Sequence, residues 1–254
     1  MSDDNFMGMQ ESFISHLVEL RDRLVKACAG IALVCVALFA WPGPSAIYDF
    51  LAAPMIAALP TGSKMIATGV ISPFLVPMKV TLLVAFVVAL PWVLYQAWAF
   101  IAPGLYTHEK RLIAPLVISS SVLFAAGVAF CYFFVFGRVF KFISEFAPTS
   151  ITVAPDIENY LDFVMSMCLA FGMTFEVPVV VVILVRMGIV SIEKFKAIRS
   201  YVIVGSFVVA AIVTPPDVVS QLSLAIPMWL LFEVGLLVAP IFVKATTAPE
   251  NDQA

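Results

Sequence analysis

The sequence predicts an all-α membrane protein with six transmembrane helices. Of its 254 residues, 62% are hydrophobic and only 12% are charged, whereas an ordinary soluble domain carries about 25% charged residues. The mean hydropathy is +1.05, and several apolar runs approach the roughly 20 residues that a helix needs to cross a bilayer core. A helix satisfies its own backbone groups without water, so these runs indicate membrane-spanning helices.

Six apolar runs are the candidate spans. The fifth has 12 residues, which reach about 18 Å as a helix, and it ends at Thr214-Pro215-Pro216-Asp217. We therefore expect short fifth and sixth spans joined as a hairpin. We also expect one membrane domain over residues 1–243 and a disordered tail over 244–254. The expected spans cover residues 24–41, 74–100, 113–136, 160–185, 202–213 and 222–243.

The orientation follows from lysine and arginine, which are retained on the cytoplasmic side. Ten lie in connections on one side and four on the other, which predicts that both termini are cytoplasmic. If the fifth and sixth runs formed one re-entrant unit, the termini would still share a side. The first group is Arg21, Arg23, Lys26, Lys110, Arg111, Arg186, Lys194, Lys196, Arg199 and Lys244, and the second is Lys64, Lys79, Arg138 and Lys141.

The connection over residues 42–73 is long and rich in proline and glycine, and it surrounds the mixed polar and apolar segment 47–51. Long connections in compact proteins are often ordered and functional. We expect a short interfacial helix here, within an ordered cap on the outer side of the membrane.

The sequence lacks the residues that several classes of function require. The basic residues are scattered, so nucleic-acid binding is not predicted. The four cysteines lie in apolar runs without a CxxC pair, and the only histidines are His16 and His108, so we predict no metal site and no cofactor. Neither a GxSxG elbow nor an HExxH pair is present, and the chain is not predicted to be an enzyme. The first eleven residues carry no basic residue, so the first apolar run is expected to be a retained span.

Polar side chains inside apolar runs are functional candidates, because lipid makes them costly. Glu176 lies deepest, in the fourth run, and Gly172 one turn earlier is expected to leave an indentation beside its carboxyl group. The alternative is a protonated glutamic acid that only bonds another helix. Glu233 and Lys79 are weaker candidates of the same kind, with a structural role as their alternative.

Two cytoplasmic segments carry further candidates. Residues 12–24 place apolar side chains on one stripe and Glu19 and Arg23 beside it, which predicts an amphipathic helix at the interface. Residues 98–111 combine aromatic residues with Pro103-Gly104 and present Glu109 beside two basic residues. By composition alone, these segments are a solvated helix face and an aromatic belt.

These segments resemble the TatC family, the receptor subunits of twin-arginine protein translocases. The resemblance extends from about residue 12 to residue 240, and its unusual strings occur in order between six predicted spans. The strings are HLVELRDR from His16, YQAWAFIAPGL from Tyr95, HEKR from His108, FGMTFEVP from Phe171, TPPD from Thr214 and LAIP from Leu224.

The resemblance implies a concave six-span bundle in the bacterial inner membrane. It implies a receptor that captures the twin-arginine signal peptides of folded precursors and assembles as an oligomer with the single-span proteins TatA and TatB, using the proton gradient. A guanidinium group is bound best by a carboxylate through parallel hydrogen bonds. We therefore expect Glu19 and Glu109 to bind the arginines. The resemblance implies that Arg21 supports this site and that Phe100 lines it.

The resemblance also assigns residues elsewhere in the chain. Pro54, Phe74 and Asp217 would maintain the outer cap and its coupling to transport. Glu176 would lie in the concave face of the bundle, and Thr214 and Gln221 would contact partner helices through hydrogen bonds. Such bonds between helices in lipid contribute roughly 0.6 to 2 kcal/mol.

Two rival classes remain. A small-solute transporter would use Glu176 as a proton site, and it predicts unwound helices and several polar groups converging in the middle of the membrane. An intramembrane enzyme would need a nucleophile or a metal set, which the motifs do not supply.

Overall fold

The computed structural model describes residues 3–59, 64–105, 113–146, 148, 154–215 and 217–244, with side chains described within 14–100 and 114–241 of these ranges. In the described residues the chain is helical, apart from one isolated parallel bridge between Ile66 and Asp156. The helical class predicted from the sequence is confirmed.

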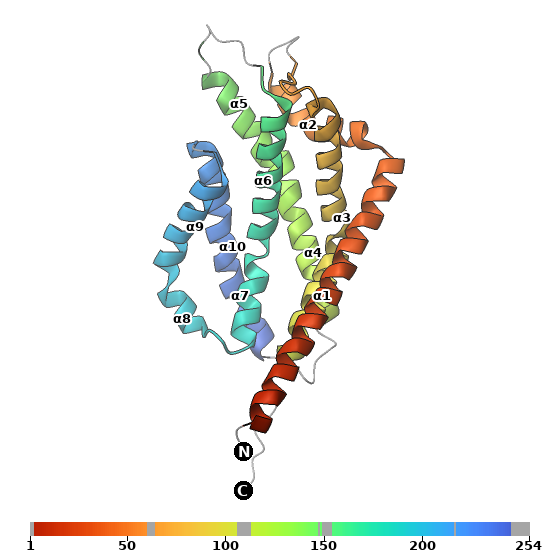
Figure 1. Ribbon diagram of the computed structural model, residues 1–254. Coiled ribbons are helices and arrows are strands. Elements are labelled where there is room, and N and C mark those ends of the chain that lie inside the picture. The colour runs from red at the N-terminus through yellow and green to blue at the C-terminus, as the bar shows by residue number, and fades with distance from the viewer. Residues whose placement is uncertain are drawn as a thin grey trace. The chain divides into compact units, whose positions relative to one another are not determined.

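The contacts divide the chain, whose helices are labelled in Figure 1, into two compact units. Two of the three boundaries fall inside helices, and the third lies between the first two helices. Unit 1 comprises Met1–Gly43 and Thr81–Ser121, and unit 2 comprises Pro44–Val80 and Val122–Ala254. The helices are α1 (Asp3–Ala40), α2 (Pro44–Ala58), α3 (Ser72–Leu105), α4 (Ile113–Phe130), the π-helix η2 (Cys131–Val135), α5 (Phe136–Phe146), α6 (Ile157–Phe175), α7 (Val177–Arg186), α8 (Ile192–Ala197), α9 (Arg199–Val213) and α10 (Val218–Lys244).

Five apolar helical stretches in the described residues are long enough to cross a membrane, and α9 is a shorter apolar helix. The chain is therefore a helical membrane protein, and its short fifth run is a 15-residue helix. The division into one domain over 1–243 and a disordered tail stays a prediction, and residues 245–254 lie outside the described residues. The five stretches are Ile14–Ala40, Ser72–Phe100, Ala114–Phe146, Ile157–Arg186 and Val218–Ile241.

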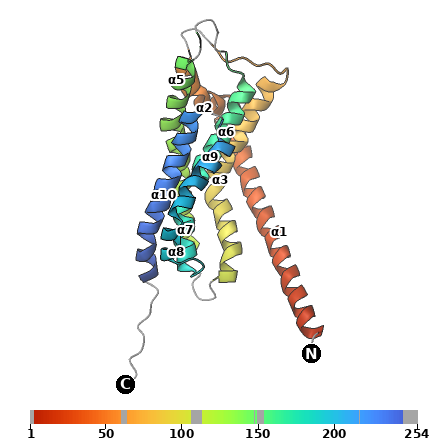
Figure 2. The same cartoon turned by 90° about the vertical axis from the view of Figure 1, so that its left-hand side faces the viewer.

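The N-terminal amphipathic segment and the first span form one helix, not two. Helix α1 runs without a break over 38 residues, as Figure 2 shows. Between Ser12 and Ala40 the only residue that disfavours a helix is Gly30. The interfacial helix expected over residues 12–24 is therefore the first half of a longer helix.

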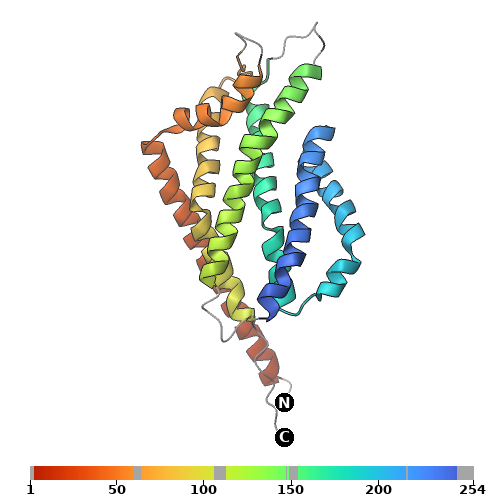
Figure 3. The same cartoon turned by 180° about the vertical axis from the view of Figure 1, so that it is seen from behind.

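The third span is longer than predicted. Helix α4 passes through the π-turn of η2 directly into α5, and the three form one uninterrupted rod in Figure 3. Arg138 and Lys141, which we placed in an outer loop, lie on α5. Each pairs with a group one turn away, Arg138 with the Phe134 carbonyl and Lys141 with Glu145. Because both charged side chains have partners on the same rod, the helix continues past them.

The fourth run is one candidate span but two helices. Helix α6 ends at Phe175 and α7 begins at Val177, so Glu176 lies in the break, with α7 continuing beyond α6 in Figure 1. Pro178 causes the break, because its missing N–H and its ring both oppose a bond with the carbonyl four residues earlier. The span predicted over residues 160–185 lies within the single candidate span Ile157–Arg186, but the sequence analysis did not predict the break at Glu176.

The sixth span is not short. Helix α10 has 27 residues, because it begins at Val218 rather than at Leu222. The Asp217 carboxylate accepts a hydrogen bond from the Ser220 N–H at 2.7 Å, an N-cap that starts the helix directly after the prolines.

The helix expected within residues 42–73 is present as α2 (Pro44–Ala58).

One hydrophobic cluster of unit 2 lies where α10 packs against α7 and α8. Gly235 permits a close approach to α7, because a Cβ there would lie 3.0 Å from the Cα of Pro178. The buried residues of this cluster are Val181, Val185, Phe195, Phe232, Leu236 and Ala239.

Candidate functional site

Within unit 1, a series of contacts joins the first half of α1 to the second half of α3. The His16 ring stacks on Phe100, with 4.4 Å between centroids and 20° between planes. Arg23 donates to Gln96 Oε1 at 3.3 Å, and Trp92 Nε1 donates to the Lys26 carbonyl at 2.8 Å. We call these residues the α1–α3 ladder.

Glu19 lies on the ladder side of α1, one turn before Arg23. Its Oε1 accepts a hydrogen bond from Arg23 Nη2 at 3.4 Å, and 38% of its side chain is exposed. An ionised carboxylate has about four acceptor positions, and this contact occupies one of them. Glu19 therefore retains acceptor capacity toward the surface.

Arg21 lies away from Glu19 on the helix, since residues two apart do not face each other. Its side chain is 72% exposed and donates to Asp22 Oδ1 at 2.9 Å. Phe100 is brought to α1 by its stack on His16, a contact that the sequence analysis did not predict. Glu109 lies outside the described residues, so its pairing with Glu19 stays a prediction.

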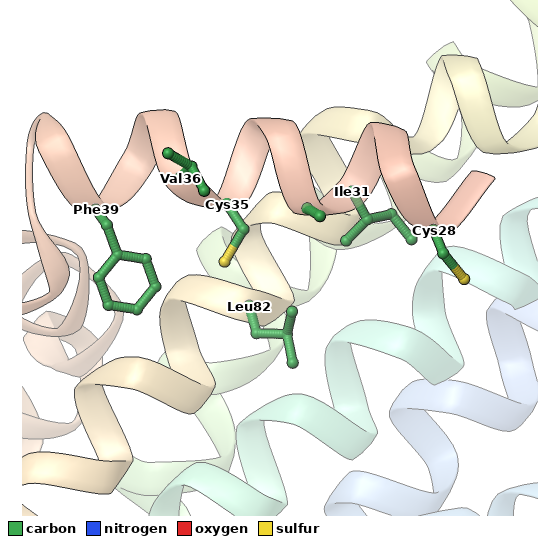
Figure 4. A pocket seen from close by; sticks show the side chains of 7 residues that line it. Cys28, Ile31, Cys35, Val36, Phe39 and Leu82 are labelled. Atoms are coloured by element: carbon green, nitrogen blue, oxygen red, sulfur yellow. The ribbon is translucent and has the colours of Figure 1, made fainter. Parts of the chain in front are cut away.

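Unit 1 also contains an apolar groove of about 500 Å³ between α1 and Leu82 of α3. Figure 4 shows Cys28, Cys35 and Phe39 of α1 on the side that faces Leu82. Its remaining lining residues are Ile31, Ala32 and Val36. The lining carries no ionisable group other than the two thiols and does not resemble a site for a polar solute.

Gly172 does not leave an indentation beside Glu176. The Phe124 ring of α4 occupies the place where a Cβ of Gly172 would lie. Gly127 makes the reciprocal approach, since its Cβ would lie 2.5 Å from the Phe171 carbonyl oxygen. Both glycines therefore serve the packing of α4 on α6, and the expected hollow was wrong because the sequence does not show which ring faces it.

Glu176 itself lies half-buried at the α6–α7 break, where its N–H donates to the Met173 carbonyl at 3.1 Å. A break of this kind exposes backbone groups beside a carboxyl group, which the sequence analysis missed although Pro178 signals it. The role of Glu176 in the bundle stays a prediction.

The other two polar candidates have partners in unit 2. Glu233 Oε2 accepts a hydrogen bond from Arg199 Nη2 at 2.7 Å, which ties α10 to the start of α9. Lys79 Nζ lies 4.0 Å from Glu158 Oε1, and Ser72 donates to the other oxygen of Glu158 at 2.9 Å. These contacts favour the structural alternative for both residues.

The connection before α3 is tied to the start of α6, and Asp156 is the centre of this tie. Its Oδ2 accepts from the Thr68 hydroxyl at 2.7 Å and from the Thr68 N–H at 3.0 Å. Its Oδ1 caps α6 by accepting from the Glu158 and Asn159 N–H groups. The bonds from Thr68, followed by that from Asn159, hold the pKa of Asp156 below its usual range.

Helix α2 is tied to the same region by two phenols. Tyr132 of η2 donates to the Phe50 carbonyl at 2.6 Å, and Tyr160 of α6 donates to the Leu51 carbonyl at 2.7 Å. We call α2, residues 64–71 and Asp156 the α2 cap. Pro54 lies inside α2, one turn after Phe50.

The remaining predicted residues lie at helix ends. Phe74 is in the first turn of α3 and is 66% exposed, and Asp217 is the N-cap of α10. The buried Thr214 hydroxyl donates to the Ala210 carbonyl at 2.8 Å, and Gln221 Nε2 donates to the Phe207 carbonyl at 3.4 Å. The Thr214 bond lies within the end of α9, whereas the Gln221 bond joins α10 to α9. A contact of either residue with partner helices stays a prediction.

No cluster of histidine, cysteine and acidic residues suited to a metal occurs among the described residues. Cys131 and Cys168 are buried, and all four cysteines are free thiols. The core of unit 2 thus contains cysteine as a small packing residue.

Helices of this length and composition define a polytopic membrane protein, and comparison with known proteins identifies its class. Residues 15–227 match the family model described as Sec-independent protein translocase protein (TatC). The chain is 48% identical over 244 residues to a Sec-independent protein translocase protein TatC of Haemophilus influenzae, covering 96% of this chain and 93% of that one. It is 48% identical over 235 residues to that of Escherichia coli K12, covering 92% and 90%.

A solved structure agrees. The crystal structure of a twin arginine translocase receptor, TatC, matches with a TM-score of 0.76 at 35% identity and covers 89% of this chain and 98% of that one. The chain belongs to the TatC family of Sec-independent protein translocases. It is a component of protein transport and not a catalytic enzyme, so neither rival class applies.

Proposed function

We propose that this chain is the signal-peptide receptor of a twin-arginine translocase in a bacterial inner membrane. It binds the paired arginines of folded precursors, assembles with TatA and TatB, and works with the proton gradient. It crosses the membrane six times as one concave domain, with both termini in the cytoplasm. The proposal rests on its membership of the TatC family and on the partly exposed carboxylate of Glu19 within the α1–α3 ladder.

Glu19 supports the proposal by its chemistry. Its bond to Arg23 demonstrates that the carboxylate can accept from a guanidinium group at this position, and the 3.4 Å distance makes it a weak bond. An incoming arginine can share or replace this contact. A second carboxylate, Glu109, would bind the other arginine of the pair, and Phe100 would cover the site through its stack on His16.

The experiment measures photo-crosslinking of a signal peptide carrying Arg-Arg to the purified chain and to Glu19→Gln and Glu109→Gln variants. A charge-assisted hydrogen bond contributes about 1.5 to 3 kcal/mol, so each variant should lose roughly ten- to a hundredfold in affinity, measured as crosslinking at a peptide concentration below saturation. Glu145→Gln is the matched control, because Glu145 is an exposed carboxylate in an i,i+4 pair with Lys141 on α5.

Two outcomes contradict the proposal. Undiminished crosslinking in both glutamine variants removes these residues from the site. A peptide carrying Lys-Lys that crosslinks as strongly as Arg-Arg excludes recognition by paired hydrogen bonds to guanidinium.

The contact with TatA and TatB is proposed at α9 and α10. Gln221 carries an amide, and α9 exposes apolar side chains such as Ile212, which is 77% exposed. A photo-reactive residue at Ile212 should crosslink to a single-span partner, whereas one at Leu33 of α1, which is 73% exposed, serves as the control. Equal crosslinking from both positions would remove α9 as the specific contact.

A further inference from the structure

Helix α2 contains an internal proline, which leaves one backbone carbonyl without its usual donor. In an α-helix, the N–H of residue 54 would donate to the carbonyl of residue 50. Proline has no N–H, and its ring also pushes that carbonyl aside. Pro54 therefore leaves the Phe50 carbonyl without a donor from its own helix, so a donor from another element can bind it.

Tyr132 supplies this donor. Its hydroxyl lies 2.6 Å from the Phe50 carbonyl oxygen, a short distance for an O–H···O bond. Its ring also stacks on the Phe50 ring, with 4.9 Å between centroids and 12° between planes. Two contacts of different kinds therefore join the same pair of residues, 82 positions apart in the chain.

The π-turn gives Tyr132 its direction. Tyr132 lies in η2, where the Phe136 N–H donates to the Cys131 carbonyl, five residues earlier. This turn includes one residue more than an α-turn, so it rotates the side chains before it relative to those after it. Cys131 and Val135 point into the core and are 0% and 2% exposed, while Tyr132 points to α2.

The neighbouring carbonyl offers a comparison within the same helix. Tyr160 donates to the Leu51 carbonyl at 2.7 Å. Four residues after Leu51 is Met55, which has an N–H, so the Leu51 carbonyl does not depend on the tyrosine for its only donor. The two phenols hold adjacent carbonyls, but only the Phe50 carbonyl lacks a donor from its own helix.

We infer that Pro54 and Tyr132 act as one unit, in which Pro54 frees the Phe50 carbonyl and Tyr132 binds it to hold α2 in the cap. Tyr132 is thus a positioning residue, and the importance of Pro54 lies in the bond that it makes available. The connection of this unit to export rests on the function proposed above, whereas the bond itself can be tested separately.

The test is a double-mutant cycle of Pro54→Ala and Tyr132→Phe, measured by maleimide labelling at Ala52→Cys in the full chain. Ala52 is 0% exposed, so labelling requires α2 to open, and mass spectrometry of the α2 peptide separates it from the native cysteines. A hydrogen bond contributes about 0.5 to 1.5 kcal/mol, so Tyr132→Phe should raise the labelling rate by about three- to tenfold. In the Pro54→Ala background, where the helix donor is restored, the same change should raise it less than about twofold.

Tyr160→Phe is the matched control. Its effect on labelling should be the same with Pro54 or alanine, because the Leu51 carbonyl keeps a helix donor in both. An equal fold-change for Tyr132→Phe in the two backgrounds would overturn the inference. Tyr132→Phe retains the ring stack, and size-exclusion chromatography with circular dichroism checks that each variant folds.

Export provides the second measurement. If the unit acts in transport, Tyr132→Phe should lower export of a twin-arginine precursor, and Pro54→Ala should restore part of the loss. Photo-crosslinking of the Arg-Arg peptide should remain unchanged in these variants. Loss of crosslinking at Glu19→Gln together with the expected labelling cycle would support the receptor function and the inference independently. The same loss of crosslinking with an equal effect of Tyr132→Phe in both backgrounds would remove only the inference.

Discussion

The α1–α3 ladder of unit 1 and the α2 cap of unit 2 are both joined by contacts between distant parts of the chain, but the contacts differ in kind. In the ladder, Arg23 bonds the side chains of Glu19 and Gln96 at 3.4 and 3.3 Å. In the cap, tyrosine hydroxyls bond main-chain carbonyls at 2.6 and 2.7 Å. A side chain can exchange partners by changing rotamer, whereas a main-chain carbonyl is fixed by its helix.

This difference suits two tasks. A binding surface for an incoming cation gains from carboxylates whose existing partner is weakly held, since the partner can be displaced or shared. A cap that holds a helix in place gains from bonds to groups that cannot move alone. The next four predictions test this distinction, and all use thermal unfolding of the purified chain in detergent.

The largest effect is expected at Gly127. Its added Cβ in Gly127→Ala would meet the Phe171 carbonyl oxygen of α6, a main-chain atom that cannot yield without moving the helix. Overpacking of this kind costs about 1 to 3 kcal/mol. Gly30→Ala in α1 is the comparison, because there the added Cβ meets a side chain, the Trp92 indole, rather than the main chain. A larger loss at Gly30 than at Gly127 would contradict the distinction.

A smaller effect is expected at Asp156, and it depends on pH. Asp156→Ala removes the N-cap of α6 and the bonds from Thr68, so the melting temperature should fall. Because folding lowers the pKa of Asp156, the carboxylate stabilises the folded chain above its ordinary value of 3.8 and loses this contribution as pH falls through the lower value of the folded state.

The matched variant is Asp156→Asn, which can still cap a helix but does not titrate. Below pH 3.8 the native chain should lose melting temperature faster than this variant does. If the melting temperatures of the two proteins fall equally as the pH is lowered, the group responsible for the pH dependence is not Asp156.

Trp92→Phe tests the one ladder contact that reaches the main chain. The change removes the bond to the Lys26 carbonyl, and a hydrogen bond contributes about 0.5 to 1.5 kcal/mol. The loss should lie at the low end, because that carbonyl also accepts from its own helix. A loss above that range would mean that the indole packing on Gly30 carries most of the stability of the contact.

The smallest effect is expected at Arg23. Arg23→Gln breaks a partly exposed i,i+4 pair, which contributes about 0.3 to 0.5 kcal/mol. The melting temperature should therefore change little. A fall as large as that of Trp92→Phe would show that the contacts of Arg23 with Glu19 and Gln96 hold the ladder, which contradicts the argument that these partners are weakly engaged.

Local sequence accounts for much of the fold because its signals are local. Pro215 and Asp217 set the end of α9 and the start of α10, since one lacks an N–H and the other caps a helix. Pro178 signals the break at Glu176, although the hydropathy of the run concealed it. The uninterrupted course of α1 follows from the absence of a strong helix breaker, which we underestimated.

The site could be predicted only in part. The pairing of Glu19 with Arg23 can be predicted, because the two residues lie one turn apart on a helix. The bond between Arg23 and Gln96 cannot, because it depends on how α1 and α3 pack. The partner of Glu233 could not be predicted either, because Arg199 is 34 residues away and is reached only when α9 and α10 form their hairpin.

By itself, the sequence determined that this protein is helical, that it belongs in a membrane and that it resembles one family, because apolar length, helix breakers and motif order are properties of the chain alone. The tertiary structure decided which groups meet. It placed the Phe124 ring over Gly172 and the Tyr132 hydroxyl on the carbonyl that Pro54 leaves free. Such contacts depend on the relative rotation of packed helices, which no local pattern encodes.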